Sequence, residues 1–191
     1  MSWQDVSGLI GAVGGTIGTI AAFLVYLQSG SRVRLKVSVG IQNPGINVGQ
    51  GQVGLIQIDP RKFSGSFGHG LDYSFARLVL IVEARNVGRL AVNVESLNLN
   101  RDKVEFGGAN LFQGAHRLPH RFDFGTSAIW MAPFEDAMTL ATIDFPDKKR
   151  RKLVGAVMKL GNGRLVRSRN KLSASHLGDV QAAWLKMKAQ S

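Results

Sequence analysis

Residues 77–99 read RLVLIVEARNVGRLAVNVESLNL, and this stretch decides the fold class. Leu78 to Val82 are all apolar, which is typical of a strand buried on both faces. Residues 86–89, Asn-Val-Gly-Arg, form a turn signal, and residues 90–99 then alternate between apolar and polar with a slip near Glu95-Ser96. Two strands joined by a short Asn/Gly turn predict a β-hairpin.

The flanking sequence adds further short strands. Residues 33–41 alternate apolar and polar side chains, as in a half-buried strand. Gly161-Asn162-Gly163 separates two apolar stretches, 153–160 and 164–169, and predicts a closing hairpin. A proline followed by two acidic residues predicts a short helix at residues 133–140. Weaker strand patterns lie at residues 53–58, 103–106, 121–124 and 127–131. The pattern predicts a mainly β, antiparallel sandwich or barrel.

The last residues of the chain have a helical period. Leu177, Val180, Trp184 and Met187 recur at helical spacing, with Ser175 as the expected N-cap. We expect a short amphipathic helix docked against the sandwich; a membrane interface or a partner protein is the alternative surface for its apolar side.

Residues 6–27 carry no charged side chain. As a helix these twenty-two residues would be roughly 33 Å long, enough to cross a hydrocarbon core of about 30 Å. Arg32, Arg34 and Lys36 follow at once, so the positive-inside rule predicts a single-pass protein of the cell membrane with its N-terminus outside and its C-terminal domain cytoplasmic. A cleaved signal peptide is the alternative, but a basic n-region and a convincing cleavage site are missing.

Small residues recur every four positions along this predicted span. Close approach of two such helices in lipid would make the chain a homo-oligomer, although glycine is also simply common in membrane spans. The expected membrane-helix packing residues are Ser7, Gly11, Gly14, Gly15, Gly18 and Thr19.

The chain therefore divides into three parts by sequence. Residues 1–28 hold the N-terminal extension and transmembrane helix, residues 29–172 the β-sandwich, and residues 173–191 the amphipathic helix. A hydrophobic content of 45% excludes wholesale disorder, and the absence of cysteine agrees with a reducing compartment.

The formal charge of +11 is concentrated in one block. Residues 148–171 hold ten basic and no acidic side chains, whereas residues 1–147 hold twelve of each. Binding to anionic lipid or phosphate is the functional reading, with nucleic acid as the weaker partner and a merely solvated face as the plain alternative. The block comprises Lys148, Lys149, Arg150, Arg151, Lys152, Lys159, Arg164, Arg167, Arg169 and Lys171.

Catalytic and metal-binding patterns are not recognisable. His116 and His120 are four residues apart, but Pro119 between them opposes a helical metal face. Trp130 is expected to be a core anchor. The sequence thus predicts no enzyme, no cofactor and no metal site.

One segment supports a resemblance to a known class of domain. Residues 80–94 resemble the strand-turn-strand of immunoglobulin-like domains in uncharacterised bacterial single-span membrane proteins. The later features of the pattern would be Leu118-Pro119, the Trp130-bearing strand at 125–130 and the hairpin at 163–168. The resemblance implies an immunoglobulin-like sandwich without a disulfide, and it carries over no catalytic residue.

We therefore expect a non-enzymatic, membrane-tethered binding or assembly module that acts on a protein partner the sequence does not name. Two alternatives stay open. One is a pore-forming or membrane-disrupting effector with an oligomerising glycine-rich helix, and the other is a nucleic-acid-binding or virion structural protein.

Overall fold

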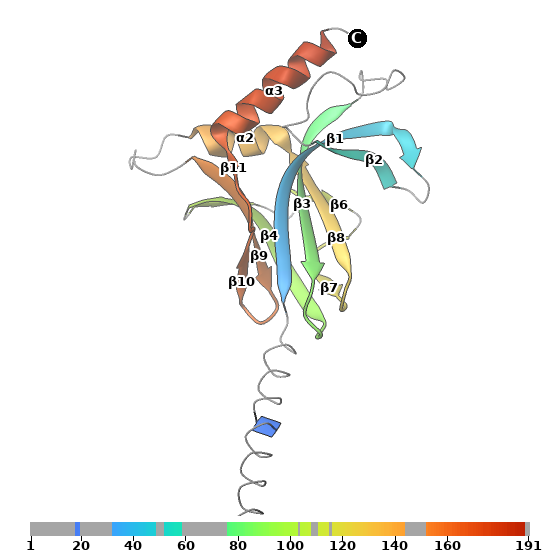
Figure 1. Ribbon diagram of the computed structural model, residues 1–191, viewed down its shortest axis with the longest axis vertical. Coiled ribbons are helices and arrows are strands. Elements are labelled where there is room, and N and C mark those ends of the chain that lie inside the picture. Colours follow the sequence, from blue (N-terminus) through green and yellow to red (C-terminus); the bar gives the residue numbers. More distant parts are fainter. Residues whose placement is uncertain are drawn as a thin grey trace, which may run out of the picture.

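A computed structural model describes residues 18–19, 32–48, 52–58, 76–102, 104–107, 111–114, 116–143 and 152–189, with residues 43–48 and 52–58 described by their backbone alone. Within these ranges the chain forms two antiparallel sheets and the helices α2 and α3 (Figure 1). The predicted mainly β, sandwich-like architecture is confirmed.

The first sheet has the strand order β2-β1-β3-β8-β6. Its strands are β1 (Val33–Val48), β2 (Gln52–Ile58), β3 (Arg77–Asn86), β6 (Gln113–Gly114) and β8 (Ser127–Pro133). The second sheet has the order β10-β9-β4-β5, with β11 also paired to β9 and β7 to β4. Its strands are β4 (Val92–Arg101), β5 (Val104–Phe106), β7 (His120–Phe122), β9 (Leu153–Leu160), β10 (Leu165–Arg167) and β11 (Leu172–Ser173).

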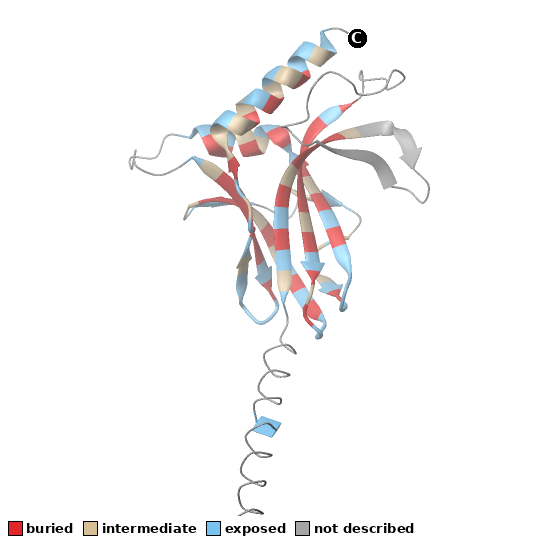
Figure 2. Ribbon diagram, in the orientation of Figure 1, coloured by how far each residue is buried: buried red, intermediate tan, exposed pale blue. Residues whose placement is uncertain are grey.

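The core lies between the two sheets. Alternate residues of β1 are buried, as Figure 2 shows by its banded colouring, and those of β3, β4, β8 and β9 meet them. Trp130 of β8 is only 1% exposed, which confirms its predicted role as a core anchor. Each fully buried Leu, Val or Phe side chain contributes about 1.5–3 kcal/mol relative to exposure, so this layer drives folding.

The predicted hairpin between β3 and β4 is wrong. β3 pairs with β1 on one edge and with β8 on the other, so neither edge is free for β4. The turn at residues 87–91 instead carries the chain from one sheet to the other. The buried Asn86 stabilises this crossing, because its side-chain Nδ2 donates to the carbonyl oxygens of Leu90 (2.8 Å) and Phe122 (3.2 Å).

Two irregularities of strand register lie where the sequence indicates a break. The β4 register shifts between Val94 and Ser96, which confirms the predicted slip. β1 does not end near residue 41, as the predicted strand does, but continues past Asn43-Pro44-Gly45 to Val48, with a register shift between Asn43 and Asn47. A bulge there lets the strand pass a proline and a glycine without ending.

The predicted short helix is α2 (Phe134–Thr142), which has no basic residue in its last turn. A buried arginine of β4 supplies the positive charge instead. Arg101 Nη1 donates to the carbonyl oxygens of Leu140 (2.9 Å), Ala141 (3.0 Å) and Ile143 (2.6 Å). Because these carbonyls carry the negative end of the helix dipole, Arg101 fixes α2 to the end of the second sheet.

The C-terminal helix α3 (Ala174–Lys188) docks against this core, as expected, through Leu177, Val180 and Trp184. Its N-cap differs from the prediction. Ser173, not Ser175, accepts a hydrogen bond from the backbone nitrogen of His176 (3.1 Å). The helix begins two residues early because Ser173 still belongs to β11 and so holds the extended conformation that an N-cap needs.

Residues 168–170 link the two sheets, and we call them the crossing segment. Ser168 forms two hydrogen bonds with Ala156 of β9: its nitrogen donates to Ala156 O (2.8 Å), and its Oγ accepts from Ala156 N (3.0 Å). Arg169 N then donates to Leu35 O of β1 (3.0 Å). The side chain of Asn170 accepts from Val37 N (2.9 Å) and donates to Val37 O, as a neighbouring strand would.

Replacing Asn170 should destabilise the fold. Asn170→Ala leaves the partly buried N–H and C=O of Val37 without these partners, at a cost of about 1–3 kcal/mol. The control is Lys171→Ala, at an exposed neighbouring position, where a change within about 0.5 kcal/mol is expected. Denaturant unfolding of the full chain in detergent measures both. Equal midpoints for the two variants would show that the side chain of Asn170 adds nothing to stability.

Candidate functional site

Four segments meet at the end of the sandwich that lies opposite α2 and α3 (Figure 1). They are the start of β1 at Arg32 and the turns at residues 87–91, 123–126 and 161–164. The antiparallel register places them together, because Val33 pairs with Asn86 and Val94 with Leu160. We call this the Arg32 end.

Backbone hydrogen bonds fix the Arg32 end. The carbonyl oxygen of Arg32 accepts from the nitrogens of Val87 (2.7 Å) and Gly88 (3.1 Å). Asn86 joins the turn at residues 87–91 to the turn at residues 123–126, since its nitrogen donates to Thr126 O and its carbonyl accepts from Gly125 N, both at 3.0 Å. The point at which the chain enters the sandwich is therefore part of the folded structure.

Exposed apolar side chains occupy the tips of these turns. Leu90 is 57% exposed, Phe124 is 63% exposed, and Leu165, the first residue of β10 after the last turn, is 46% exposed. The turns at residues 87–91 and 123–126 thus each present one large apolar group to solvent, whereas Leu165 lies opposite Lys159 on the outer face of the second sheet. Leu90 and Phe124 lie on two turns that the hydrogen bonds of Asn86 hold together, so they form one exposed apolar pair, and we interpret this pair as a contact surface. The other exposed large apolar side chains of the described residues, apart from Leu165, lie elsewhere: Val104, Phe106, Ile129, Ile143 and Leu185.

Arginines surround these apolar tips. The exposed arginines of the segments that meet here are Arg32, Arg34, Arg85, Arg89, Arg121 and Arg164. Asp123 is the only acidic residue among the described residues of 32–34, 85–91, 120–127 and 161–165. Its Oδ1 lies 3.4 Å from Nε of Arg121, and both side chains are exposed, so this ion pair is weak.

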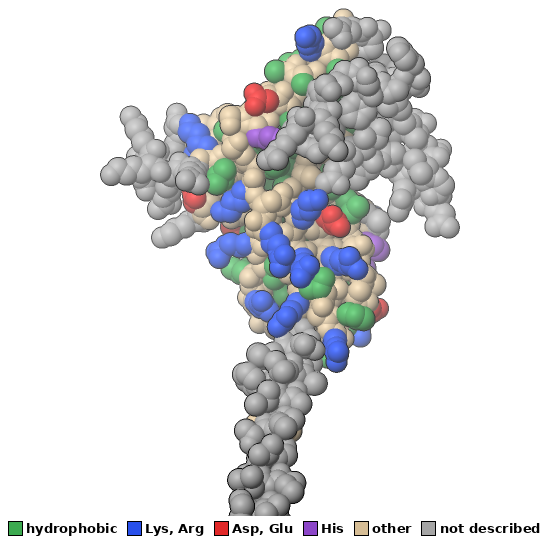
Figure 3. All heavy atoms as spheres, in the orientation of Figure 1, with side chains coloured by type: hydrophobic (Ala, Val, Ile, Leu, Met, Phe, Trp, Pro, Cys, Tyr) green, Lys and Arg blue, Asp and Glu red, His purple; other side chains and the backbone are tan. Residues whose placement is uncertain are grey.

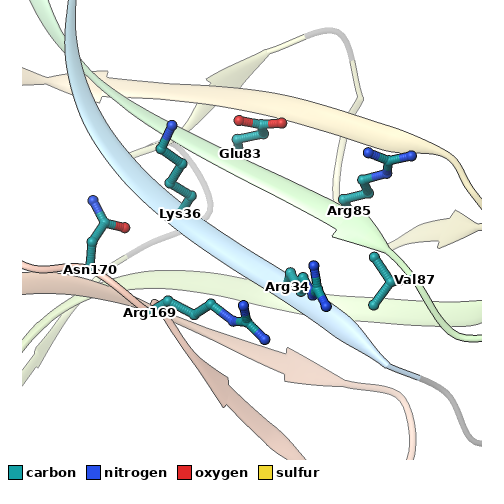
Figure 4. Close-up of a pocket in the computed structure, with 7 residues that line it drawn as sticks. All are labelled: Arg34, Lys36, Glu83, Arg85, Val87, Arg169 and Asn170. Atoms are coloured by element: carbon teal, nitrogen blue, oxygen red, sulfur yellow. The ribbon is translucent and has the colours of Figure 1, made fainter. Parts of the chain in front are cut away.

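A pocket of about 380 Å³ opens beside this end on the outer face of the first sheet. It is lined by Arg34 and Lys36 of β1, Glu83 and Arg85 of β3, Val87 of the following turn, and Arg169 and Asn170 of the crossing segment (Figure 4). Figure 3 shows Lys and Arg side chains gathered over this part of the surface. Four cations and one carboxylate give the pocket a positive potential.

The strand register sets like charges side by side in the pocket. Arg34 lies directly opposite Arg85 in the β1–β3 ladder, and Lys36 lies opposite Glu83. Like charges at directly opposed positions destabilise a sheet. Among the described residues, no ion pair joins Arg34, Arg85 or Arg169 to a carboxylate, and Glu83 is the one carboxylate in the lining of the pocket.

The structure distributes the predicted basic block over different surfaces. Arg164 lies at the Arg32 end and Arg169 in the pocket. Lys159 and Arg167 lie on the outer face of the second sheet, where Lys159 Nζ is 2.8 Å from Glu95 Oε2 and that carboxylate raises the pKa of Lys159. Lys152 and Lys171 are exposed at other positions, and residues 148–151 lie outside the described part of the chain.

The sequence prediction missed the partners of Arg169. The sequence pattern marks Arg34 and Lys36 only as the positive flank of the predicted span and gives Arg85 no role. Their alternation along β1 does reveal that Arg34 and Lys36 share a face. The pocket is completed by the pairing of β1 with β3 and with the crossing segment. No pattern of neighbouring residues in the sequence predicts that long-range pairing.

The predicted membrane-helix packing residues lie outside the described residues, except Gly18 and Thr19, which are helical and exposed. In the part of the chain that the structure describes, none of the helices has the length and apolar character needed for a membrane span. The span at residues 6–27 therefore stays a prediction.

A second cavity, of about 950 Å³, opens on the other side of the molecule between β4, β6 and the loop that follows β6. Trp130 lines it, and its Nε1 donates to the carbonyl oxygen of His116 (2.9 Å). The ring of His116 stacks on that of His120 at a centroid distance of 4.1 Å. His120 and Phe122 continue this aromatic contact to Trp130, so the two histidines pack onto the edge of the core.

Comparison with protein-family models and with curated proteins finds no match for this chain.

The His116–His120 stack predicts a pH dependence of stability. Burial, and then the neighbouring His116, lower the pKa of His120, with a smaller opposing effect of Asp123. The unfolded chain therefore binds a proton at His120 at a higher pH than the folded chain does. Stability from this group is present above the ordinary histidine pKa of about 6.5 and is lost as the pH falls below it.

We expect the free energy of unfolding to fall between pH 7.5 and pH 5.5, and to fall less in His120→Gln. Urea unfolding of the full chain in detergent at each pH measures the slope. Between pH 7.5 and pH 9, where histidine is neutral, the two proteins should have the same slope. A variant that keeps the whole acid-side slope of the wild type would contradict the assignment to His120.

Proposed function

We propose that this chain is a non-enzymatic, membrane-tethered binding or assembly module whose sandwich rests on an anionic bilayer through its Arg32 end. In this proposal residues 6–27 span the cell membrane once, with the N-terminus outside and the sandwich, of immunoglobulin-like type, in the cytoplasm. The observation that carries the proposal is the coincidence, at one end, of exposed apolar turn tips, surrounding arginines and the start of β1.

The length of the connection supports this orientation. Four residues, 28–31, separate the predicted span from Arg32. Even fully extended, the chain from Leu27 to Arg32 covers at most about 18 Å. The backbone bonds from Val87 and Gly88 hold Arg32 in the fold. The Arg32 end therefore lies near the lipid headgroups whenever residues 6–27 are in the bilayer.

The chemistry of this surface suits a headgroup layer. Guanidinium groups bind phosphate oxygens in bidentate pairs, and each basic group near an anionic membrane contributes about 1 kcal/mol. Leu90 and Phe124 can enter the boundary between headgroups and acyl chains, where a fully buried side chain of this size gains about 1.5–3 kcal/mol. The two contributions act at the same end of the molecule.

The contact surface differs from the basic hairpin that the sequence predicts. The proposed surface uses Arg164 from the basic block together with arginines from β1, β3 and the turns. Lys159 and Arg167 lie on another face. Oligomerisation through the small residues of the span is a separate prediction that this surface does not require.

Site-specific labelling tests the proposed contact cleanly because the chain has no cysteine. Phe124→Cys at the Arg32 end and Leu185→Cys on α3 are matched positions, with native side chains 63% and 59% exposed. An environment-sensitive fluorophore is attached to each full-length variant in vesicles of phosphatidylcholine with phosphatidylglycerol. We expect the label at position 124 to be shielded from aqueous iodide and quenched by a lipid-borne quencher, and the label at position 185 to show the reverse.

Vesicles of phosphatidylcholine alone provide the second comparison, in which shielding at position 124 should decrease. Equal iodide quenching at the two positions in anionic vesicles would contradict the proposed orientation. Recovery of the full chain in the supernatant after carbonate extraction would contradict the tether itself.

A further inference from the structure

We propose that the pocket between β1, β3 and the crossing segment is a binding site for a phosphomonoester dianion. Nothing in the proposed contact of the turn tips with a bilayer requires such a site, and the pocket would bind the same group on a soluble ester or on a lipid headgroup. The proposal therefore goes beyond membrane tethering.

The composition of the pocket selects an anion of high charge. Arg34, Arg85 and Arg169 offer guanidinium groups, whose planar donors match phosphate oxygens, and Lys36 adds an ammonium group. In Figure 4 the side chain of Arg169 extends toward Arg34, with Arg85 beyond it, while Glu83 lies on the side of Lys36. The single carboxylate leaves an excess of three positive charges, which a dianion offsets better than a monoanion.

The like-charge register supplies an independent reason for an anion. Arg34 and Arg85 are directly opposed across the β1–β3 ladder, and among the described residues neither has an ion-pair partner. An opposed pair of like charges weakens the sheet in the absence of a ligand. A phosphate group between the two guanidinium groups replaces that repulsion with two attractive contacts.

The backbone that carries these cations is fixed before any ligand arrives. Arg169 N donates to Leu35 O, and Asn170 bonds both polar groups of Val37. The turn after Arg85 is held to Arg32 O by Val87 N and Gly88 N. Three segments distant in sequence are thus locked around one pocket, so that binding orders only side chains.

The size of the pocket favours an ester over a bare ion. A volume of about 380 Å³ exceeds what a single phosphate group occupies and lies within the usual range of small-molecule sites. The apolar side chain of Val87 contributes to the lining and can contact the organic part of an ester. We therefore expect glycerol 3-phosphate to bind more tightly than inorganic sulfate.

The test compares Arg167, the last residue of β10, with Arg169 in the crossing segment that follows β10. Arg169→Ala removes a pocket cation, and Arg167→Ala removes an equal charge from the outer face of the second sheet, two residues away. Both keep the backbone bonds of the crossing segment. Isothermal titration of the full chain in non-ionic detergent with glycerol 3-phosphate should show affinity at least about tenfold weaker for Arg169→Ala and within about twofold of the wild type for Arg167→Ala.

Arg85→Ala is a second variant with a readout that mere misfolding would not produce. It should also weaken binding about tenfold, yet its thermal unfolding midpoint in phosphate-free buffer should equal or exceed that of the wild type, because it removes the charge opposed to Arg34. A lowered midpoint together with unchanged binding would overturn the proposed role of this pair.

A parallel arm distinguishes the two sources of the phosphate group. Nanodiscs that contain phosphatidic acid, with phosphatidylglycerol nanodiscs as the phosphodiester control, present the monoester on a lipid. Binding of glycerol 3-phosphate, of phosphatidic acid or of both that depends on Arg169 supports the site. The ligand that binds shows whether the phosphate group comes from a soluble ester or from a lipid headgroup. Absence of binding in both arms, or equal loss in Arg167→Ala and Arg169→Ala, would overturn it. Failure of the bilayer orientation leaves the glycerol 3-phosphate arm unaffected.

Discussion

The crossing segment at residues 168–170 is the constraint on which the arrangement of this protein depends. Ser168 bonds β9 of one sheet, and Arg169 and Asn170 bond β1 of the other, within three consecutive residues. The first part of β1 has β3 on one side, and the crossing segment covers its other edge, which would otherwise offer unpaired backbone groups. The same bonds place Arg169 beside the outer face of β1. The crossing segment therefore both joins the two sheets and completes the cationic pocket.

The two ends of the sandwich have different roles in this account. α2 and α3 close one end, where Arg101 binds the last carbonyls of α2 and α3 buries Trp184. The opposite end has no helical cover among the described elements (Figure 1) and presents arginines with exposed apolar turn tips. This asymmetry gives the domain a defined direction relative to the start of β1.

Local patterns predicted the elements of this fold but not their partners. The alternation of β1, the hairpin around Gly161–Gly163 and the stripe of α3 are properties of neighbouring residues, and the structure confirms them. The turn at Asn86 looks like a hairpin turn, yet it crosses between sheets, because β1 and β8 already occupy both edges of β3. The pocket was missed for the same reason. A charge count along the chain separates Arg34 and Arg85 from Arg169, whereas the register and the crossing segment bring them together.

The most direct measurement of the central claim is hydrogen–deuterium exchange of the full chain in nanodiscs. We predict that amides in the turns at residues 87–91, 123–126 and 161–164 exchange more slowly in anionic than in zwitterionic nanodiscs, while α3 exchanges at the same rate in both. Equal exchange of the turns in the two lipids, or slowing confined to α3, would contradict the claim that the Arg32 end rests on an anionic bilayer.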